Sequence, residues 1–137
     1  MDMHASMAAF GRLTYALMRM GAGLLFMEHG LQKLFGMFGG FGGNPGATAP
    51  LASQMGLAGI LELVGGGLVA LGLLTRPVAL LLAIEMIVAF VQVHLPRGGF
   101  PIENGGELAL VYALVFLFLA GHGAGPVSLG RSFRRST

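Results

Sequence analysis

Residues 108–120 read LALVYALVFLFLA, a run without a charged residue or a proline. Such a run belongs at the centre of a helix that crosses a membrane or is fully buried, because its side chains are unfavourable in water. Of the 137 residues, 55% are hydrophobic and 10% are charged, against about 25% charged in an average soluble domain. Since so few charges cannot cover the surface of a soluble domain, we expect an all-α membrane protein.

Three further apolar stretches precede this run. Each has close to the roughly 20 residues that a membrane-spanning helix needs. The predicted spans are residues 13–35, 55–74, 78–95 and 106–125. Glycine and proline concentrate in residues 39–50 and 96–106, which favours loops there. The sequence therefore predicts a single membrane domain, residues 1–137, that folds as a four-transmembrane-helix bundle.

The distribution of Lys and Arg predicts the orientation of these spans. An even number of spans puts both termini and the turn at Arg76 on one side of the membrane. The basic residues of that side are Arg12, Arg76, Arg131, Arg134 and Arg135, with Arg19 near enough to extend toward it. The other side holds Lys33 and Arg97. Because basic residues are retained in the cytoplasm, we expect a multi-pass protein of the inner (cytoplasmic) membrane with both termini cytoplasmic.

Composition also excludes several kinds of chemistry. The chain has no cysteine, which excludes disulfides and thiolate-bound metal or iron–sulfur centres. Its net charge of +2 comes from dispersed residues and does not form the basic surface that nucleic acid requires. The sequence has no metal-ligand spacing, Walker motif or dinucleotide fingerprint. We therefore expect no metal site and no nucleic-acid partner.

Polar side chains recur at one depth in all four predicted spans. With a rise of 1.5 Å per residue, the outer ends of the spans bring one set of polar residues together. This candidate site consists of His29, Lys33, Glu62, His94 and Glu107. Gln92 lies near the same depth, and Glu85 lies deeper in the third span. These two residues are on one helix face, and we expect both to be buried polar residues.

Glu62 is the residue for which a position facing lipid would be most unfavourable. An ionised carboxylate in the middle of a bilayer costs at least about 2.5–3.5 kcal/mol. Glu62 shares a face with Gly66 and Ala70, small residues that allow close helix packing. We therefore expect Glu62 to point into the bundle and to pair with Lys33 or His29. Such a pair could fix the register of the helices or take part in function, and the sequence leaves both interpretations open.

The order of several short motifs resembles a known family. HGLQKLFG closes the first span at residues 29–36, GILE opens the second at 59–62, and LGLLTR ends it at 71–76. His94 follows in the third span, and GGE opens the fourth at 105–107. This order, over about residues 13–130, resembles the DoxX family of small bacterial and archaeal membrane proteins.

The resemblance implies a four-helix membrane bundle with a connection to membrane oxidoreductases. The family takes its name from a membrane subunit linked to an archaeal terminal oxidase, and its relatives include membrane subunits of thiosulfate:quinone oxidoreductase. The wider superfamily also includes cargo receptors and assembly chaperones. The family's polar motif positions correspond here to His29, Lys33, Glu62, Arg76, His94 and Glu107. Glu85 has no place in that pattern.

Three functions are compatible with the sequence. In the first, the chain is an integral membrane subunit of a quinone-linked oxidoreductase system, the candidate site binds a quinone or relays its protons, and a partner supplies the electrons. In the second, it is a non-enzymatic assembly or interaction subunit whose polar residues lock the helices together. In the third, it is a small-solute carrier, for which four helices would need to form a homo-oligomer. The expected partners are the lipid bilayer and a redox or other membrane protein.

Reporter fusions test the predicted topology. Fusions after Phe41 and after Gly99 should report a periplasmic location, and a fusion after Thr137 a cytoplasmic one, because Lys and Arg concentrate on the side of the termini. The reverse pattern would contradict both the orientation and the placement of the candidate site in the outer leaflet.

Overall fold

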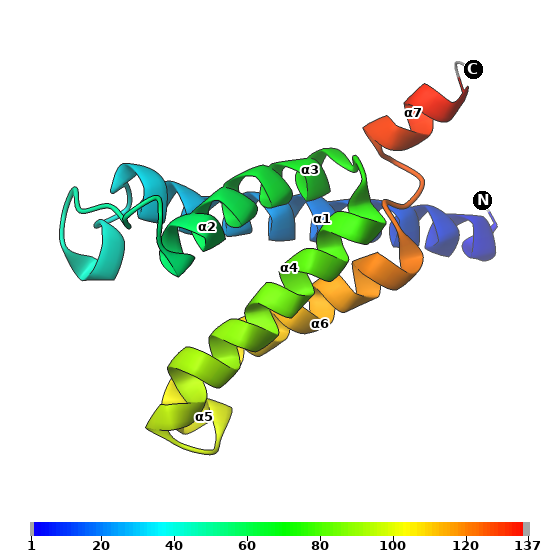
Figure 1. Cartoon of the computed structure of the whole chain (residues 1–137). Coiled ribbons are helices and arrows are strands. Elements are labelled where there is room, and N and C mark those ends of the chain that lie inside the picture. Colours follow the sequence, from blue (N-terminus) through cyan, green and yellow to red (C-terminus); the bar gives the residue numbers. More distant parts are fainter. Residues whose placement is uncertain (1, 136–137) are drawn as a thin grey trace.

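The computed structural model describes residues 2–135, which form helices joined by turns and loops and contain no β-strand (Figure 1). Arg134 and Arg135 were expected to contribute to the orientation of the chain in the membrane, and their side chains lie outside the described part. The α-helices are α1 (Met3–Phe35), α2 (Gln54–Ile60), α3 (Gly66–Leu71), α4 (Thr75–Ala89), α5 (Pro101–Asn104), α6 (Glu107–His122) and α7 (Leu129–Arg135). The π-helical segments η2 (Leu61–Gly65) and η3 (Phe90–His94) join α2 to α3 and extend α4. Two 3-10 turns, η1 (Phe41–Gly43) and η4 (Leu95–Arg97), lie in the connections.

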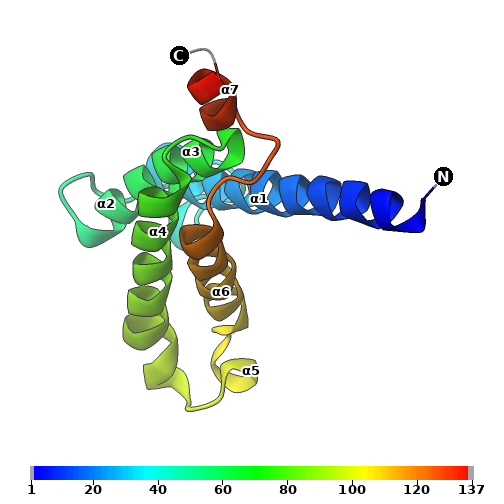
Figure 2. The same ribbon diagram turned by 90° about the vertical axis from the view of Figure 1, so that its right-hand side faces the viewer.

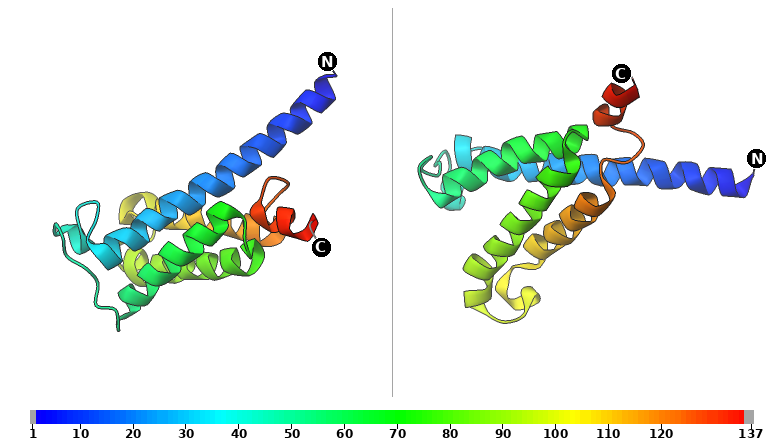
Figure 3. Two further views of the ribbon diagram at one scale, coloured as in Figure 1. Left: turned by 90° about the horizontal axis from the view of Figure 1, so that it is seen from above. Right: turned by 45° about the vertical axis from the view of Figure 1, so that its right-hand side comes forward.

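The long helices form two antiparallel pairs. In the first pair, α1 packs along α2, η2 and α3; in the second pair, α4 packs along α6. The pairs meet near the turn between α3 and α4 and diverge toward the loop after α1 and toward α5 (Figures 1 and 2). Both termini lie toward the end where the pairs meet (Figure 3). The pairs therefore touch at one end and separate at the other.

The all-α prediction is confirmed. Among the described helices, the segments Gln54–Leu71 and Thr75–Arg97 are long and apolar enough to cross a membrane, and α6 is apolar but shorter. The number of spans and their orientation remain predictions. α1 contains the whole of the first predicted span, residues 13–35, and begins at Met3, where the Asp2 side chain caps its first turn by accepting a hydrogen bond from the His4 N–H at 3.1 Å.

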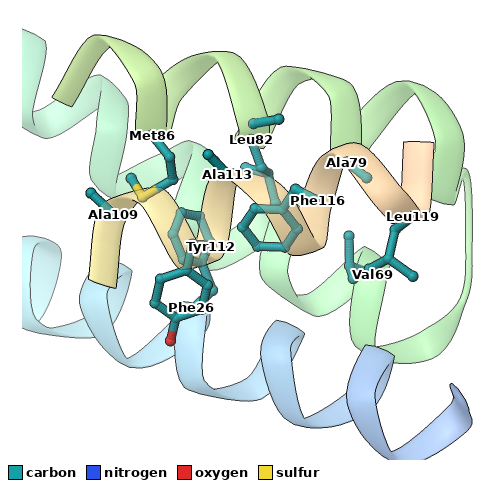
Figure 4. Close-up of a cluster of buried hydrophobic side chains, with 11 residues drawn as sticks. Phe26, Val69, Ala79, Leu82, Met86, Ala109, Tyr112, Ala113, Phe116 and Leu119 are labelled. Atoms are coloured by element: carbon teal, nitrogen blue, oxygen red, sulfur yellow. The ribbon is translucent and has the colours of Figure 1, made fainter. Parts of the chain in front are cut away.

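The buried core lies where all four long helices come together (Figure 4). Phe26 from α1, Val69 from α3, Leu82 from α4 and Phe116 from α6 are buried almost completely. The rings of Phe26 and Phe116 meet edge to face with centroids 4.9 Å apart, a favourable arrangement for aromatic side chains. The core therefore fixes how the first pair sits on the second.

Glycines allow the helices of the first pair to approach closely. A Cβ atom added to Gly23 would lie 2.5 Å from the carbonyl oxygen of Gly66, and one added to Gly30 would lie 2.7 Å from that of Gly59. Real Cβ atoms do not approach so closely, so side chains at these positions would force the helices apart. The predicted packing face around Gly66 is confirmed, and it uses the small-residue packing typical of membrane helices.

Arg19 connects the first pair to the segment after α6. Its guanidinium donates to the carbonyl oxygens of Val127 at 2.7 Å and Ala70 at 3.3 Å, and also to that of Ala124. Only 2% of the residue is exposed, so the expectation that Arg19 extends to the membrane surface is wrong. The reason is that carbonyl groups beyond helix ends lack helical partners and accept its hydrogen bonds inside the protein.

The glycine contacts predict a difference between two equivalent substitutions in α1. Gly30→Ala should lower the free energy of unfolding by about 1–3 kcal/mol, because the new Cβ overlaps the neighbouring backbone. Gly21→Ala is the matched control, since no atom lies within 4 Å of its added Cβ; it should be neutral or stabilising by up to about 1 kcal/mol. Unfolding in mixed detergent, followed by circular dichroism, measures both. Equal effects would contradict the close packing.

Candidate functional site

A buried ion pair joins the two helices of the first pair. The Lys33 ammonium donates to both carboxylate oxygens of Glu62, at 2.9 and 2.8 Å. Only 16% of the Lys33 side chain and 4% of the Glu62 side chain are exposed. The prediction that Glu62 points inward and pairs with Lys33 is confirmed. Each charge neutralises the other at a place where an isolated charge would be very unfavourable.

The local backbone explains how the two side chains meet. Glu62 lies in η2, a π-helical segment of the kind often found at functional sites. One turn earlier, a Cβ added to Gly59 would lie 3.0 Å from the Cβ of Lys33, so the two helices are nearly in contact there. The loop also holds the end of α1, since the Ala49 N–H donates to the Lys33 carbonyl at 2.7 Å.

A cavity of about 530 Å³, here called the central cavity, lies beside the ion pair and between the two helix pairs. Most of its wall is apolar. Leu57, Ile84 and Leu108 line it and are themselves exposed, so the cavity opens to the surface of the protein. Its polar lining residues are His29, Lys33, Gln54, Glu62, Glu85, Gln92, His94 and Tyr112. This combination suits a ligand that has both an apolar part and hydrogen-bonding groups.

The structure brings four of the five predicted candidate-site residues to this cavity. Glu107 is not among the described lining residues; it is exposed in the first turn of α6. A carboxylate at that position interacts favourably with the positive end of the helix dipole. Glu107 was assigned to the candidate site because its position along the fourth predicted span puts it at the same depth in the membrane as the other four residues. Depth alone does not determine the direction in which a side chain points.

His29 contacts aromatic rings. Its ring centroid is 6.0 Å from that of Tyr112, at an interplanar angle of 88°, and 6.1 Å from that of Phe26. Within residues 2–135, neither the His29 imidazole nor the Tyr112 hydroxyl forms a hydrogen bond. Both groups line the cavity and are therefore able to bind a ligand there.

Glu85 is a carboxyl group without a hydrogen-bonding partner. Both of its oxygens are shielded from solvent, and no group in the described part of the chain bonds to them. It lines the central cavity with Lys33 and Glu62 and interacts electrostatically with both. Leaving a buried polar group unsatisfied is costly, so Glu85 requires a proton, a ligand group or both.

Gln92 differs from its prediction in one respect. It lines the same cavity as Glu85, as expected from their shared face, but it is exposed rather than buried. The reason is its position in η3, where the helix pairs have already diverged. Its side-chain oxygen accepts a hydrogen bond from the Gln54 amide at 2.6 Å, which links η3 to the start of α2.

His94 combines a place in the cavity wall with a contact to the loop. Its Nδ1 lies 3.2 Å from the carbonyl oxygen of Asn104, and its ring stacks on Phe90 at a centroid distance of 6.3 Å. Asn104 in turn organises the loop by donating to the Gly98 carbonyl at 2.8 Å. Nδ1 is thus engaged in holding η3 against the loop, and Nε2 is the nitrogen left for a ligand.

Sequence reasoning missed two polar residues of the cavity, Gln54 and Tyr112. Tyr112 carries the only polar side chain in residues 108–120, and Gln54 lies at the same predicted depth as Gln92. Both features could have been recognised in the sequence.

The described residues offer no metal site. Within residues 2–135, no three His, Asp or Glu side chains gather in a way that could hold an ion.

Comparison with known proteins identifies relatives. Residues 14–95 match the DoxX family model, which confirms the resemblance carried by the motifs. An uncharacterized protein of Haemophilus influenzae is 38% identical over 122 residues, covering 86% of this chain and 89% of that protein. A Bacillus subtilis protein named "Putative oxidoreductase CatD" is 35% identical over 106 residues, covering 76% of this chain and 75% of that protein. No solved structure gives a significant match.

The ion pair predicts an ordered series of stabilities. Glu62→Leu should lower the free energy of unfolding by about 3–5 kcal/mol, because it leaves the Lys33 charge buried and uncompensated. Glu62→Gln should be less harmful, since the amide oxygen still accepts a hydrogen bond from Lys33. The double variant Lys33→Met/Glu62→Leu should recover most of the loss, because no isolated charge remains. Unfolding in mixed detergent measures all three, and a double variant no better than Glu62→Leu would contradict this account.

Proposed function

Because the chain belongs to the DoxX family of membrane proteins, we propose that it is an integral membrane subunit of a quinone-linked oxidoreductase system. In this proposal the chain crosses the inner membrane four times with both termini in the cytoplasm. The central cavity holds a quinone headgroup, and the apolar tail of the quinone stays in the surrounding lipid. The oxidoreductase part of the proposal is supported by the name of the Bacillus subtilis relative, "Putative oxidoreductase CatD".

The observation that carries the proposal is the set of unpartnered polar groups in a mostly apolar cavity. The His29 imidazole, the Tyr112 hydroxyl and the Glu85 carboxyl all line it, and none has a hydrogen-bond partner within residues 2–135. A quinone carbonyl accepts hydrogen bonds from an imidazole N–H or a phenol. A quinol hydroxyl donates to a carboxylate. These residues thus fit both redox states of a quinone headgroup.

The shape of the cavity agrees with such a ligand. Its wall includes exposed apolar residues such as Leu57, Ile84 and Leu108, so a tail can leave the cavity sideways into hydrocarbon. The polar groups lie close to the Lys33–Glu62 pair, which is neutral as a unit. The ligand headgroup therefore meets hydrogen-bonding groups without a strong net charge, as suits an uncharged quinone.

In this proposal the chain positions the quinone and moves protons, whereas a partner protein supplies the electrons. Reduction of a quinone to a quinol takes two electrons and two protons. The chain has no cysteine to hold an iron–sulfur cluster. In this proposal Glu85 and His29, which both line the central cavity, deliver the protons to the quinone oxygens.

A second candidate function rests on the ion pair. Lys33 and Glu62 are fully engaged with each other, as expected for a lock that holds the first helix pair together. In that case the chain is an assembly or interaction subunit with no quinone site. The two functions differ in what happens when the cavity is altered without touching the pair.

Substitutions of residues that line the central cavity distinguish these two functions. His29→Ala and Glu85→Leu should each weaken labelling by a short-chain benzoquinone bearing a photoreactive azide by up to about tenfold, because each removes one group that can donate a hydrogen bond to a quinone carbonyl, the Glu85 carboxyl in its protonated form. Glu28→Gln is the matched control, since Glu28 is exposed and absent from the described cavity lining. Labelling is quantified by mass spectrometry of the protein in native membranes, alongside quinone-linked turnover.

Protein abundance completes the test. Normal abundance with weakened labelling in the two cavity variants supports the quinone site. If labelling and turnover of the two cavity variants equal those of Glu28→Gln, the central cavity is not a quinone site.

A further inference from the structure

A second cavity of about 740 Å³ lies at the end of the molecule where the helix pairs meet. It is formed by the turn between α3 and α4 and by the segment between α6 and α7. We call it the basic cavity, because its described lining includes Arg76, Arg131 and His122 but no Asp or Glu. It shares no lining residue with the central cavity.

The N-terminus of α4 lies in the wall of the basic cavity and lacks a cap. Leu74, at the capping position, has φ 49° and makes no side-chain hydrogen bond to the first turn. In the first turn of α4, Pro77 has no N–H and the Val78 N–H donates to the Leu74 carbonyl at 3.1 Å, so the N–H groups left without a partner within residues 2–135 are those of Thr75 and Arg76. They lie at the positive end of the helix dipole. Such an end binds anions, phosphate above all.

Thr75 provides an independent observation at the same place. The residue lines the basic cavity and is only 5% exposed, yet its hydroxyl has no hydrogen-bond partner in the described structure. Buried hydroxyl groups normally find a partner. A ligand in the cavity would supply the acceptor that the protein does not.

Two arginines add charge and further donors. Arg76 is held in place because it donates to the carbonyl oxygens of Gly121 and Ala120, both through Nη1. Its Nε and Nη2 form no hydrogen bond within residues 2–135, and neither does the Arg131 side chain. Guanidinium groups bind phosphate oxygens with paired hydrogen bonds, so these remaining donors suit that group.

We propose that the basic cavity binds a phosphate group. The donors that would hold its oxygens are the N–H groups of Thr75 and Arg76, the Thr75 hydroxyl and the guanidinium groups of Arg76 and Arg131, all of which line the cavity. The same chemistry is offered by the headgroup of an anionic phospholipid and by free phosphate. Basic pockets between helix ends are typical sites for anionic lipid headgroups.

The test uses the full chain, purified in a neutral detergent and stripped of lipid. Three probes are added separately: phosphatidylglycerol, phosphatidylcholine and inorganic phosphate. Native mass spectrometry measures how much lipid is retained, and the shift in thermal unfolding temperature measures phosphate binding. We expect tighter binding of phosphatidylglycerol than of phosphatidylcholine, and competition by phosphate.

Variants locate the binding. Arg131→Gln should weaken binding of the anionic probe by about fivefold, the effect of one basic residue near a lipid surface. Thr75→Val should also weaken it while leaving thermal stability unchanged, since the hydroxyl has no partner to lose. Arg12→Gln is the matched control: it removes an exposed charge of α1 that lies outside the described cavity lining.

The outcomes are distinct. A preference for phosphatidylglycerol that Arg131→Gln and Thr75→Val reduce identifies a lipid headgroup as the ligand. Binding of inorganic phosphate that these variants reduce, without any preference between the lipids, identifies free phosphate. If Arg12→Gln weakens binding as much as Arg131→Gln, or if neither cavity variant weakens binding of any probe, the proposal is wrong.

Discussion

The buried ion pair between Lys33 and Glu62 is the interaction on which the first helix pair depends. In a bilayer the hydrophobic effect does not drive helices together, because lipid tails are as apolar as leucine. A pair of opposite charges acts differently: any slide or rotation of α1 along α2 and α3 would leave two charges exposed in an apolar medium. The glycine contacts at Gly23 and Gly30 add close packing to the same interface. The register of the first pair is thus set by charge and shape together.

The way the second pair diverges from the first also affects which polar groups of the central cavity have partners. Toward the end where the pairs meet, Arg19 and Arg76 donate to carbonyl oxygens of the α6 end and the segment beyond it, so that helix end has partners. Where the pairs diverge, Gln54 and Gln92 still form a hydrogen bond from one wall to the other. His29 and Glu85 form none with any group in the described part of the chain. The chemistry of the central cavity follows from the divergence of two pairs that are each well packed.

Much of this arrangement could be predicted from sequence, and the failures have one cause. Hydropathy located the long helices, and the cost of a lone carboxylate left few partners for Glu62, so its pairing with Lys33 was predictable. The exposure of Gln92, the burial of Arg19 and the position of Glu107 outside the cavity were not. Each depends on how the second pair is inclined to the first, and neither hydropathy nor residue spacing encodes that inclination. The two π-helical segments, which shift the faces of the helices that carry Glu62 and His94, have no sequence signal that we recognise either.

The length of α1 has a mechanical consequence. Its 33 residues extend about 50 Å at 1.5 Å per residue, whereas the hydrocarbon core of a bilayer is about 30 Å thick. Its first turns project past the other helices (Figure 3). Arg19 and Lys33, about 21 Å apart along the helix, are both tied to other parts of the chain, so α1 cannot slide along its axis to relieve hydrophobic mismatch. A long apolar helix can respond by tilting or by thickening the bilayer locally, and a tilt of α1 must carry α2 and α3 along. The thickness of the surrounding lipid is thereby coupled to the distance between the helix pairs, and hence to the width of the opening between them.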